Sequence, residues 1–154
     1  MVRSAGDIVS SYSLSSCVGC GKCDKVCPSS RNGGIRPDHL IAAILAADPS
    51  SELQELQADV WKCLMCHRCS TICPKKIDVT GTIRTLRYDS LSSGETPKRF
   101  RMASDTLMEI GRAFPVNELV NRKRGELGLD PISYDESSVN ELKMIIARTG
   151  FRHE

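Results

Sequence analysis

The residues best suited to chemistry in this sequence are its eight cysteines, which fall into two runs of identical spacing. The runs are Cys17-x₂-Cys20-x₂-Cys23-x₃-Cys27-Pro28 and Cys63-x₂-Cys66-x₂-Cys69-x₃-Cys73-Pro74, and no cysteine is left over. Three thiolates placed three residues apart on a tight loop can each reach a different iron of one [4Fe–4S] cube. The spacing therefore predicts two [4Fe–4S] clusters, whose chemistry is the transfer of single electrons.

The fourth cysteine of each run is expected to bind the cluster that the other run holds. A proline follows this cysteine and turns the chain away from its own loop, so the thiolate is free to reach the neighbouring cluster. We therefore predict two mixed ligand sets, Cys17, Cys20, Cys23 and Cys73 for one cluster and Cys63, Cys66, Cys69 and Cys27 for the other. Electron transfer of this kind needs no general base or nucleophile, and the sequence offers no convincing Ser/His/Asp set, so no catalytic residue is predicted.

Three other uses of these cysteines explain the pattern less completely. A structural zinc site would use pairs of the form C-x₂-C, but it leaves the third cysteine and the Cys-Pro of each run unexplained. A disulfide framework suits short secreted chains, and no export signal is recognisable here. The string from Cys63 to His67 matches the haem attachment pattern C-x-x-C-H, but haem would leave Cys69 and Cys73 without a role. His67 as a Rieske-type ligand is also disfavoured, because no cysteine is missing.

Several basic residues lie next to the cysteines and could influence the clusters. A nearby positive charge favours the more negative, reduced form of a cluster and so raises its potential. The equally weighted alternative is that loops are simply polar. The residues concerned are Lys22, Lys25, Arg68, Lys75 and Lys76. We expect His67 to be a polar residue at a cluster's rim, and His39 and His153 to be solvated side chains.

Helices are expected to position the two runs, which begin 46 residues apart at Cys17 and Cys63. Pro37 and Asp38 open a segment in which Leu40, Ile41, Ile44 and Leu45 share one face, and Asp48-Pro49 ends it. A second helix is predicted with Ser51 as its cap and with Leu53, Leu56 and Val60 on its apolar face. Asp78 is expected to cap a third helix, which carries Val79, Ile83 and Leu86.

The C-terminal part of the chain also has helical patterns. Thr96-Pro97 should supply a cap and a first helical position, followed by an apolar stripe from Phe100 to Ile110 and a stop at Gly111. The pattern weakens from Phe114 to Pro131, and a last helix is expected from about Asp135 to Arg148, with Gly150 as its stop. Ser90 to Glu95 is the expected hinge between the two parts.

Composition places the chain in the all-α class. Its 154 residues are 40% hydrophobic but only 5% aromatic, so the core must consist mainly of Leu, Ile, Val and Ala, which suits helices. The net charge of +2, with both signs interspersed, does not resemble a nucleic-acid binder. No apolar run approaches the roughly 20 residues that cross a bilayer, and no signal peptide is recognisable, so a cytoplasmic protein without direct membrane insertion is expected.

With helical inserts between two such runs, the chain resembles the α-helical ferredoxin family. The stretch from Val60-Trp61 through the second run to Ile77-Asp78-Val79-Thr80, together with the first run, resembles more narrowly the C subunit of heterodisulfide reductase. This resemblance covers roughly residues 14–100. We expect a two-cluster ferredoxin body over residues 1–94 and a helical extension over residues 95–154, which packs on the body or on partner subunits in a single compact unit.

The resemblance implies a relay of electrons between a flavin-containing A subunit and a B subunit with cysteine-rich CCG domains, where a disulfide is cleaved or formed. This chain has no CCG-type cysteine motif, so the disulfide chemistry is expected in the partner. Two alternatives stay open: an iron-sulfur subunit of another dehydrogenase, such as one that oxidises glycerol phosphate, lactate or glycolate, or a free ferredoxin.

Overall fold

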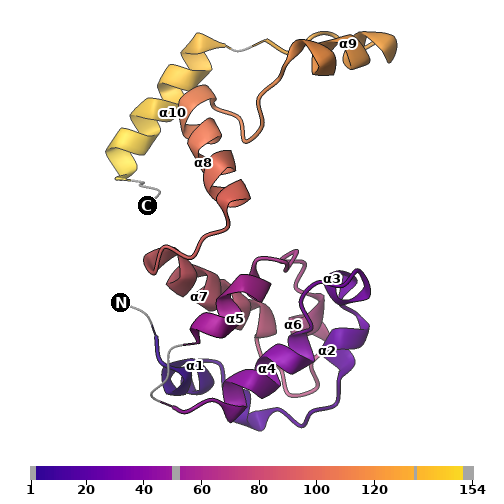
Figure 1. Cartoon of the computed structure of the whole chain (residues 1–154), viewed down its shortest axis with the longest axis vertical. Helices are drawn as coiled ribbons and strands as arrows, with labels where there is room; N and C mark the ends of the chain where they lie inside the picture. Colours follow the sequence, from indigo (N-terminus) through magenta and orange to yellow (C-terminus); the bar gives the residue numbers. More distant parts are fainter. Residues whose placement is uncertain (1–2, 50–52, 134, 151–154) are drawn as a thin grey trace. The chain divides into compact units, whose positions relative to one another are not determined.

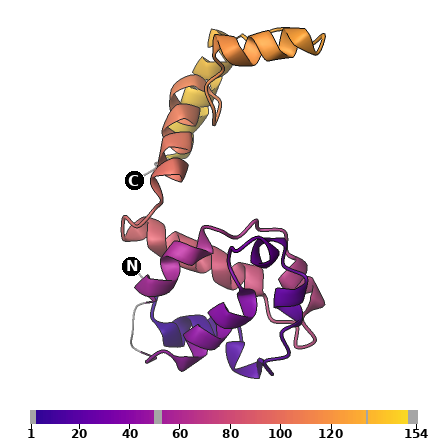
Figure 2. The same cartoon turned by 45° about the vertical axis from the view of Figure 1, so that its right-hand side comes forward.

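The computed structural model describes residues 3–49, 53–133 and 135–150, and within them the protein is helical and contains no strand. This confirms the prediction of an all-α fold (Figures 1 and 2). The helices are α1 (Ala5–Ser11), the short 3₁₀ helix η1 (Leu14–Ser16), α2 (Lys22–Lys25), α3 (Pro28–Arg31), α4 (Pro37–Ala46), α5 (Gln54–Val60), α6 (Arg68–Ile72), α7 (Val79–Ser92), α8 (Lys98–Ile110), α9 (Glu118–Glu126) and α10 (Glu136–Thr149). None of these helices combines the length and the apolar character that a bilayer span requires.

The chain forms two compact units, Met1–Thr96 and Pro97–Glu154. The first unit contains both cysteine runs and the helices from α1 to α7, and the second contains α8, α9 and α10. Helix α7 continues through Ser92, so the first residues of the segment predicted as a hinge, Ser90 to Ser92, are helical. Ser90 is fully buried, and its backbone oxygen accepts a hydrogen bond from the backbone N–H of Glu95 at 2.9 Å.

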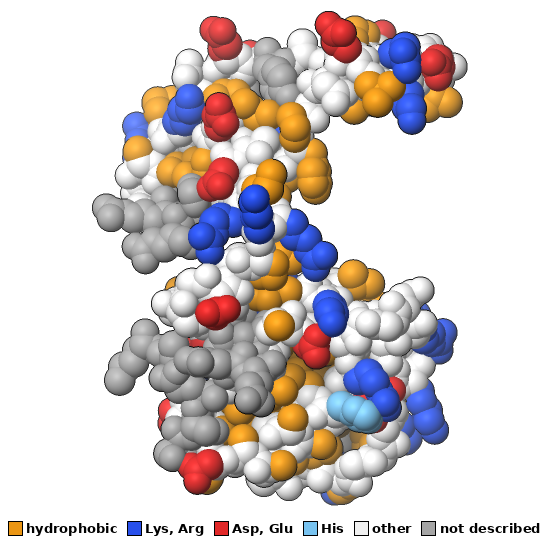
Figure 3. Space-filling view, in the orientation of Figure 1, with side chains coloured by type: hydrophobic (Ala, Val, Ile, Leu, Met, Phe, Trp, Pro, Cys, Tyr) orange, Lys and Arg blue, Asp and Glu red, His pale blue; other side chains and the backbone are white. Residues whose placement is uncertain are grey.

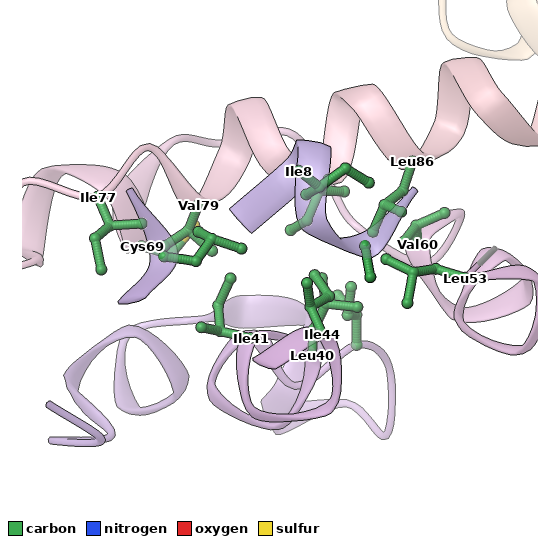
Figure 4. Packing of buried hydrophobic residues seen from close by; sticks show 14 residues of the cluster. Ile8, Leu40, Ile41, Ile44, Leu53, Val60, Cys69, Ile77, Val79 and Leu86 are labelled. Atoms are coloured by element: carbon green, nitrogen blue, oxygen red, sulfur yellow. The ribbon is translucent and has the colours of Figure 1, made fainter. Parts of the chain in front are cut away.

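The core of the first unit lies between α4 and α7, and α1 and α5 complete it. On α4 the side chains of Leu40, Ile41 and Ile44 are buried, as their spacing of three and four residues predicts. Figure 4 shows them pointing towards residues that include Val79 and Leu86 of α7. The whole cluster of buried residues is Ala5, Ile8, Leu14, Ile35, Leu40, Ile41, Ile44, Leu53, Val60, Cys69, Ile77, Val79, Ile83 and Leu86.

A side-chain cap marks the start of α7, whereas α5 has none. The carboxylate of Asp78 accepts the backbone N–H of Gly81 at 2.9 Å, which confirms the predicted cap of α7. Leu53 is buried but precedes α5 rather than belonging to it. The predicted cap at Ser51 lies outside the described residues.

Helix α1 is a feature that we did not predict from the sequence. Ser4 and Asp7 form a capping box at its start, and the side chain of Ile8 is completely buried. The spacing Ser4-x-x-Asp7 was a local signal for this helix, but the segment is too short for a repeating apolar face. Its stabilisation comes from packing on the rest of the unit.

The second unit follows its predicted pattern at most helix ends. Gly111 ends α8 and Gly150 ends α10, each with a left-handed backbone, and Asp135 caps α10. Pro97 itself is the N-cap of α8, so the helix begins at Lys98, one residue later than the Thr96-Pro97 signal indicates.

Helix α9 was also not predicted. It lacks a clear apolar stripe, and local polar contacts stabilise it instead. The Asn117 side chain caps it, and the Asn121 side chain bonds both backbone polar groups of Ile132. A stretch held this way has no periodic sequence signal.

Candidate functional site

The two cysteine runs adopt the same backbone turn from different side chains. In the first run, Gly19 and Gly21 have left-handed backbones with φ of 64° and 65°. The corresponding residues of the second run, Met65 and His67, have φ of 52° and 61°. Each turn leads into a short helix, α2 or α6, that carries the third cysteine of the run. The repeated spacing therefore produces a repeated loop.

The cysteines line two separate cavities, and each cavity contains cysteines of both runs. Three cysteines of the first run and the last cysteine of the second line the first cavity: Cys17, Cys20, Cys23 and Cys73. The last cysteine of the first run and three cysteines of the second line the other cavity, which is smaller: Cys27, Cys63, Cys66 and Cys69. In the described part of the chain no three His, Cys, Asp or Glu side chains converge on a point suited to a single metal ion.

The fourth cysteines reach the opposite cavity because of how the chain turns. Cys27 is the N-cap of α3 and has an extended backbone, as the residue before a proline usually does. Cys73 ends α6 with a similar extended backbone. Each proline thus favours an extended backbone at the cysteine before it, so the helix of the run does not continue through that cysteine, and Pro28 also begins α3.

Hydrogen bonds to sulfur surround the second cavity. The backbone N–H groups of Ser30 and Met65 approach the sulfurs of Cys27 and Cys63 at 3.5 Å and 3.4 Å. The hydroxyl of Thr80 lies 3.4 Å from the sulfur of Cys69, which is buried. Donors aimed at a thiolate stabilise its negative charge and tune a cluster bound to it.

Burial raises the pKa of two of the thiols, those of Cys23 and Cys63. It raises the pKa of Cys23 to about 11, with a smaller contribution from the nearby carboxylate of Asp38. Burial also raises the pKa of Cys63, against which the charge of Arg87 acts. Thiolates in this setting need a strongly positive partner, and the irons of a cluster provide one while displacing the protons. Four thiols around a cavity are the donor set of a [4Fe–4S] cluster, so the residues present fit this group.

The structure distributes the predicted basic residues unevenly around the cavities. Lys22 and Lys75 line the first cavity and Arg68 lines the second, whereas Lys25 and Lys76 are exposed and line neither. His67 lines the second cavity and is exposed, which agrees with a residue at its rim.

The other two histidines contribute nothing to these cavities in the described structure. His39 is exposed, and His153 lies outside the described residues.

Sequence reasoning did not identify two charged groups beside the cysteines. Asp38 lines the first cavity, whereas its place in the sequence indicates only a helix start. Arg87, on α7, donates hydrogen bonds to the backbone oxygens of Val60 and Cys63, at the entrance to the second run. Neither residue lies near a cysteine in the sequence, so only the folded chain reveals them.

Comparison with known proteins agrees with this arrangement. Residues 13–77 match the 4Fe-4S dicluster domain family. The chain is 32% identical to the C subunit of the ferredoxin/F(420)H(2)-dependent CoB-CoM heterodisulfide reductase of Methanosarcina acetivorans, over 90% of this chain and 86% of that protein. It is 31% identical to the C2 subunit of the H(2)/formate:CoB-CoM heterodisulfide,ferredoxin reductase of Methanococcus maripaludis, over 90% and 76% of the two chains. The chain belongs to the heterodisulfide reductase C-subunit family.

Membership of this family confirms the resemblance drawn from the cysteine runs and from the segment that begins at Val60-Trp61. The similarity extends over the second unit as well, since relatives align with about nine-tenths of the chain. The protein is an iron-sulfur subunit of the heterodisulfide reductase C type, it binds clusters of the [4Fe–4S] type, and its role is electron transfer.

Proposed function

We propose that this C-type subunit holds two [4Fe–4S] clusters with crossed ligands. Cys17, Cys20, Cys23 and Cys73 bind the first cluster, and Cys63, Cys66, Cys69 and Cys27 bind the second. The observation that carries this proposal is the sharing of each cavity by three cysteines of one run and the fourth cysteine of the other. The clusters supply one-electron chemistry, and the protein holds them in one small helical body.

The partners follow from what the chain lacks and from its relatives. All eight cysteines are used by the two clusters, which leaves none for disulfide chemistry. Several relatives are named as C subunits of CoB-CoM heterodisulfide reductases. We therefore infer that this protein relays electrons between a flavin-containing A-type subunit and a CCG-domain B-type subunit in a cytoplasmic complex.

The second unit has the surface of a docking element in this complex. Among its described residues none is buried, and several large apolar side chains are exposed, including Met102, Phe114, Leu127 and Met144. Figure 3 shows hydrophobic side chains at the surface of this unit. Such a surface is stabilised when another protein covers it. We propose that residues 95–154 pack against the partner subunits.

Anaerobic purification of the tagged chain from its own cells tests the partners. We expect stable recovery with an A-type flavoprotein and a CCG-domain protein, and about eight irons per C-type chain. Recovery with a hydroxy-acid or glycerol-phosphate dehydrogenase instead would contradict the proposed partners.

A pair of single variants tests the crossed ligands. Cys73→Ala should deplete the cluster of the first run, and Cys27→Ala should deplete that of the second. Iron content and the EPR spectrum of the reduced protein report each loss. If Cys73→Ala removes the second run's cluster, the ligands are not crossed.

A further inference from the structure

The two cavities differ in the sign of the partly buried charged side chains near them. Exposed cations occur at both rims, Lys22 and Lys75 at the first cavity and Arg68 at the second. Such charges are well hydrated and screened by salt, so they contribute little to a difference between the sites. The groups that can distinguish the two sites are the less exposed ones.

Behind the second cavity the less exposed charge is the guanidinium of Arg87, which is half-buried and contacts the backbone of the lining residue Cys63 without lining the cavity itself. Its Nε donates to the backbone oxygen of Val60 at 3.0 Å, and a terminal nitrogen donates to the backbone oxygen of Cys63. The guanidinium also lies over the ring of Trp61, 5.2 Å from the ring centroid. Because it is held at three points, the positive charge has a defined position beside a ligand cysteine.

Within the described residues, no carboxylate forms an ion pair with Arg87. The charge that acts on it is that of Cys63, and burial lowers its pKa. Asp78, the carboxylate near the second run, is exposed and is occupied by the backbone N–H of Gly81 and the hydroxyl of Ser70. The positive charge of Arg87 is therefore not neutralised by a described neighbour.

At the first cavity the less exposed charges are negative. Asp38 lines this cavity and Asp24 directly follows Cys23. Both carboxylates share one guanidinium, that of Arg36, at 3.3 Å from Asp24 and 3.7 Å from Asp38. The carboxylates are 18% and 25% exposed, whereas Arg36 is 48% exposed, so the solvent screens the cation more than the anions. Among the less exposed groups beside the first set of thiols, the charge is therefore negative.

Reduction adds one negative charge to a cluster, so a fixed cation favours it and a fixed anion opposes it. We propose that the guanidinium of Arg87 makes the second run's cluster the easier of the two to reduce, so that an electron within this protein rests there. The first cluster loses one electron and the second gains it, with no bond broken and no proton moved. Arg87 thus acts by its charge, which favours the reduced form of the second run's cluster. This inference rests on the two clusters proposed above.

Redox titration followed by EPR on the full-length, cluster-loaded protein tests the inference. Arg87→Gln should lower the higher of the two midpoint potentials by about 59 mV. This shift corresponds to a decrease of about tenfold in the equilibrium constant for one-electron reduction of that cluster. Arg87→Lys keeps the charge and should stay near the original value. Arg84→Gln, the same kind of change at an exposed position of α7, is the matched control and should change neither midpoint appreciably.

Two further variants assign the midpoints and test the opposite site. In Cys73→Ala the remaining cluster should titrate at the higher midpoint. Asp38→Asn should raise the lower midpoint and leave the higher one in place. The Asp38→Asn measurement still tests the inference if the Arg87→Gln protein fails to bind both clusters.

Three results would overturn the inference. These are an unchanged higher midpoint in Arg87→Gln, an equal shift in Arg87→Lys, or an unchanged lower midpoint in Asp38→Asn. A wild-type protein with one cluster would instead refute the proposed function, and it would be recognised before any variant is made.

Discussion

At the scale of single residues, the two runs show that one backbone can be built from different side chains. Glycine adopts the left-handed conformation freely at positions 19 and 21, whereas Met65 and His67 adopt it against a steric cost of roughly 1 kcal/mol each. The second loop is therefore held in shape by its surroundings to a greater degree than the first. Met65 packs against the buried core, and its backbone N–H approaches the sulfur of Cys63 at 3.4 Å.

Substitution of Gly19 by alanine tests the backbone requirement alone. A Cβ at this position would meet no protein atom within 4 Å, so no clash with the protein adds to the strain of the left-handed conformation. We expect Gly19→Ala to lower the free energy of unfolding by about 1 kcal/mol. Urea unfolding followed by circular dichroism measures it.

Gly125→Ala is the control for this prediction. The glycine lies in α9, and an added methyl group there also meets no atom within 4 Å. Alanine favours a helical backbone more than glycine does. The free energy of unfolding of this variant should therefore stay the same or increase by up to about 1 kcal/mol. An equal loss in both variants would argue against the conformational explanation.

At the scale of elements, the start of α7 connects helix capping to the second cavity. One carboxylate oxygen of Asp78 accepts hydrogen bonds from the backbone of Gly81 and from the hydroxyl of Ser70, both at 2.9 Å. The hydroxyl oxygen of Ser70 in turn accepts the backbone N–H of Thr80 at 2.9 Å, and the hydroxyl of Thr80 lies 3.4 Å from the sulfur of Cys69. The cap of one helix is therefore connected to Cys69, a proposed ligand carried by the preceding helix.

Loss of this cap should affect both stability and cluster retention. Asp78→Ala removes the bonds to Gly81 and Ser70, and we expect a loss of about 1 kcal/mol in stability together with faster bleaching of the cluster absorbance in urea. Asp135→Ala is the matched control, because Asp135 caps α10 in the second unit. It should reduce helix content without changing the bleaching rate; equal bleaching in the two variants would contradict the connection to Cys69.

The contribution of the Asp78 cap to stability should also depend on pH, because it requires the ionised carboxylate. The hydrogen bond from Gly81 lowers the pKa of Asp78 in the folded protein. Its contribution to stability is therefore complete above the ordinary value of about 3.9 and is lost as the pH falls through the lowered value. Between about pH 6 and 8 the difference in melting temperature between the wild type and Asp78→Asn should stay constant. A difference that changes steadily across this range would show that Asp78 titrates there.

At the scale of the whole molecule, the two units differ in how completely they bury apolar side chains. All the buried residues of the described structure belong to the first unit, which also contains every cysteine. The second unit has exposed apolar residues on each of its helices, such as Phe100, Leu119 and Ile145. The capacity to bind clusters and the capacity to bind partners are thus expected in separate parts of the chain.

A chain that ends at Thr96 tests this division of roles. We expect it to retain the iron content and both EPR signals of the full-length protein, because the buried core and all eight cysteines lie in the first unit. We also expect it to lose stable association with the A-type and B-type subunits in a pull-down experiment. If the shortened chain still assembles fully, the docking role of residues 95–154 is wrong.

Local and periodic signals were sufficient for much of the fold. Three-residue cysteine spacing indicated the cluster chemistry, the pattern of Leu40, Ile41 and Ile44 indicated α4, and Asp78 and Gly111 marked helix ends. These features depend on neighbours within a few positions, and such neighbours are visible in one dimension. Helices α1 and α9 were missed because they are short or lack an apolar stripe and depend on packing or side-chain hydrogen bonds.

By itself the sequence determined which residues could bind iron and that helices would carry them, because thiolate chemistry and helix propensity are properties of residues and their near neighbours. Only the tertiary structure decided which charges lie beside each group of thiols. Asp38 lies 15 residues after Cys23 and Arg87 lies 24 residues after Cys63, the cysteines on which their charges act. Their influence depends on distance and burial in three dimensions, and chain separation carries no information about either.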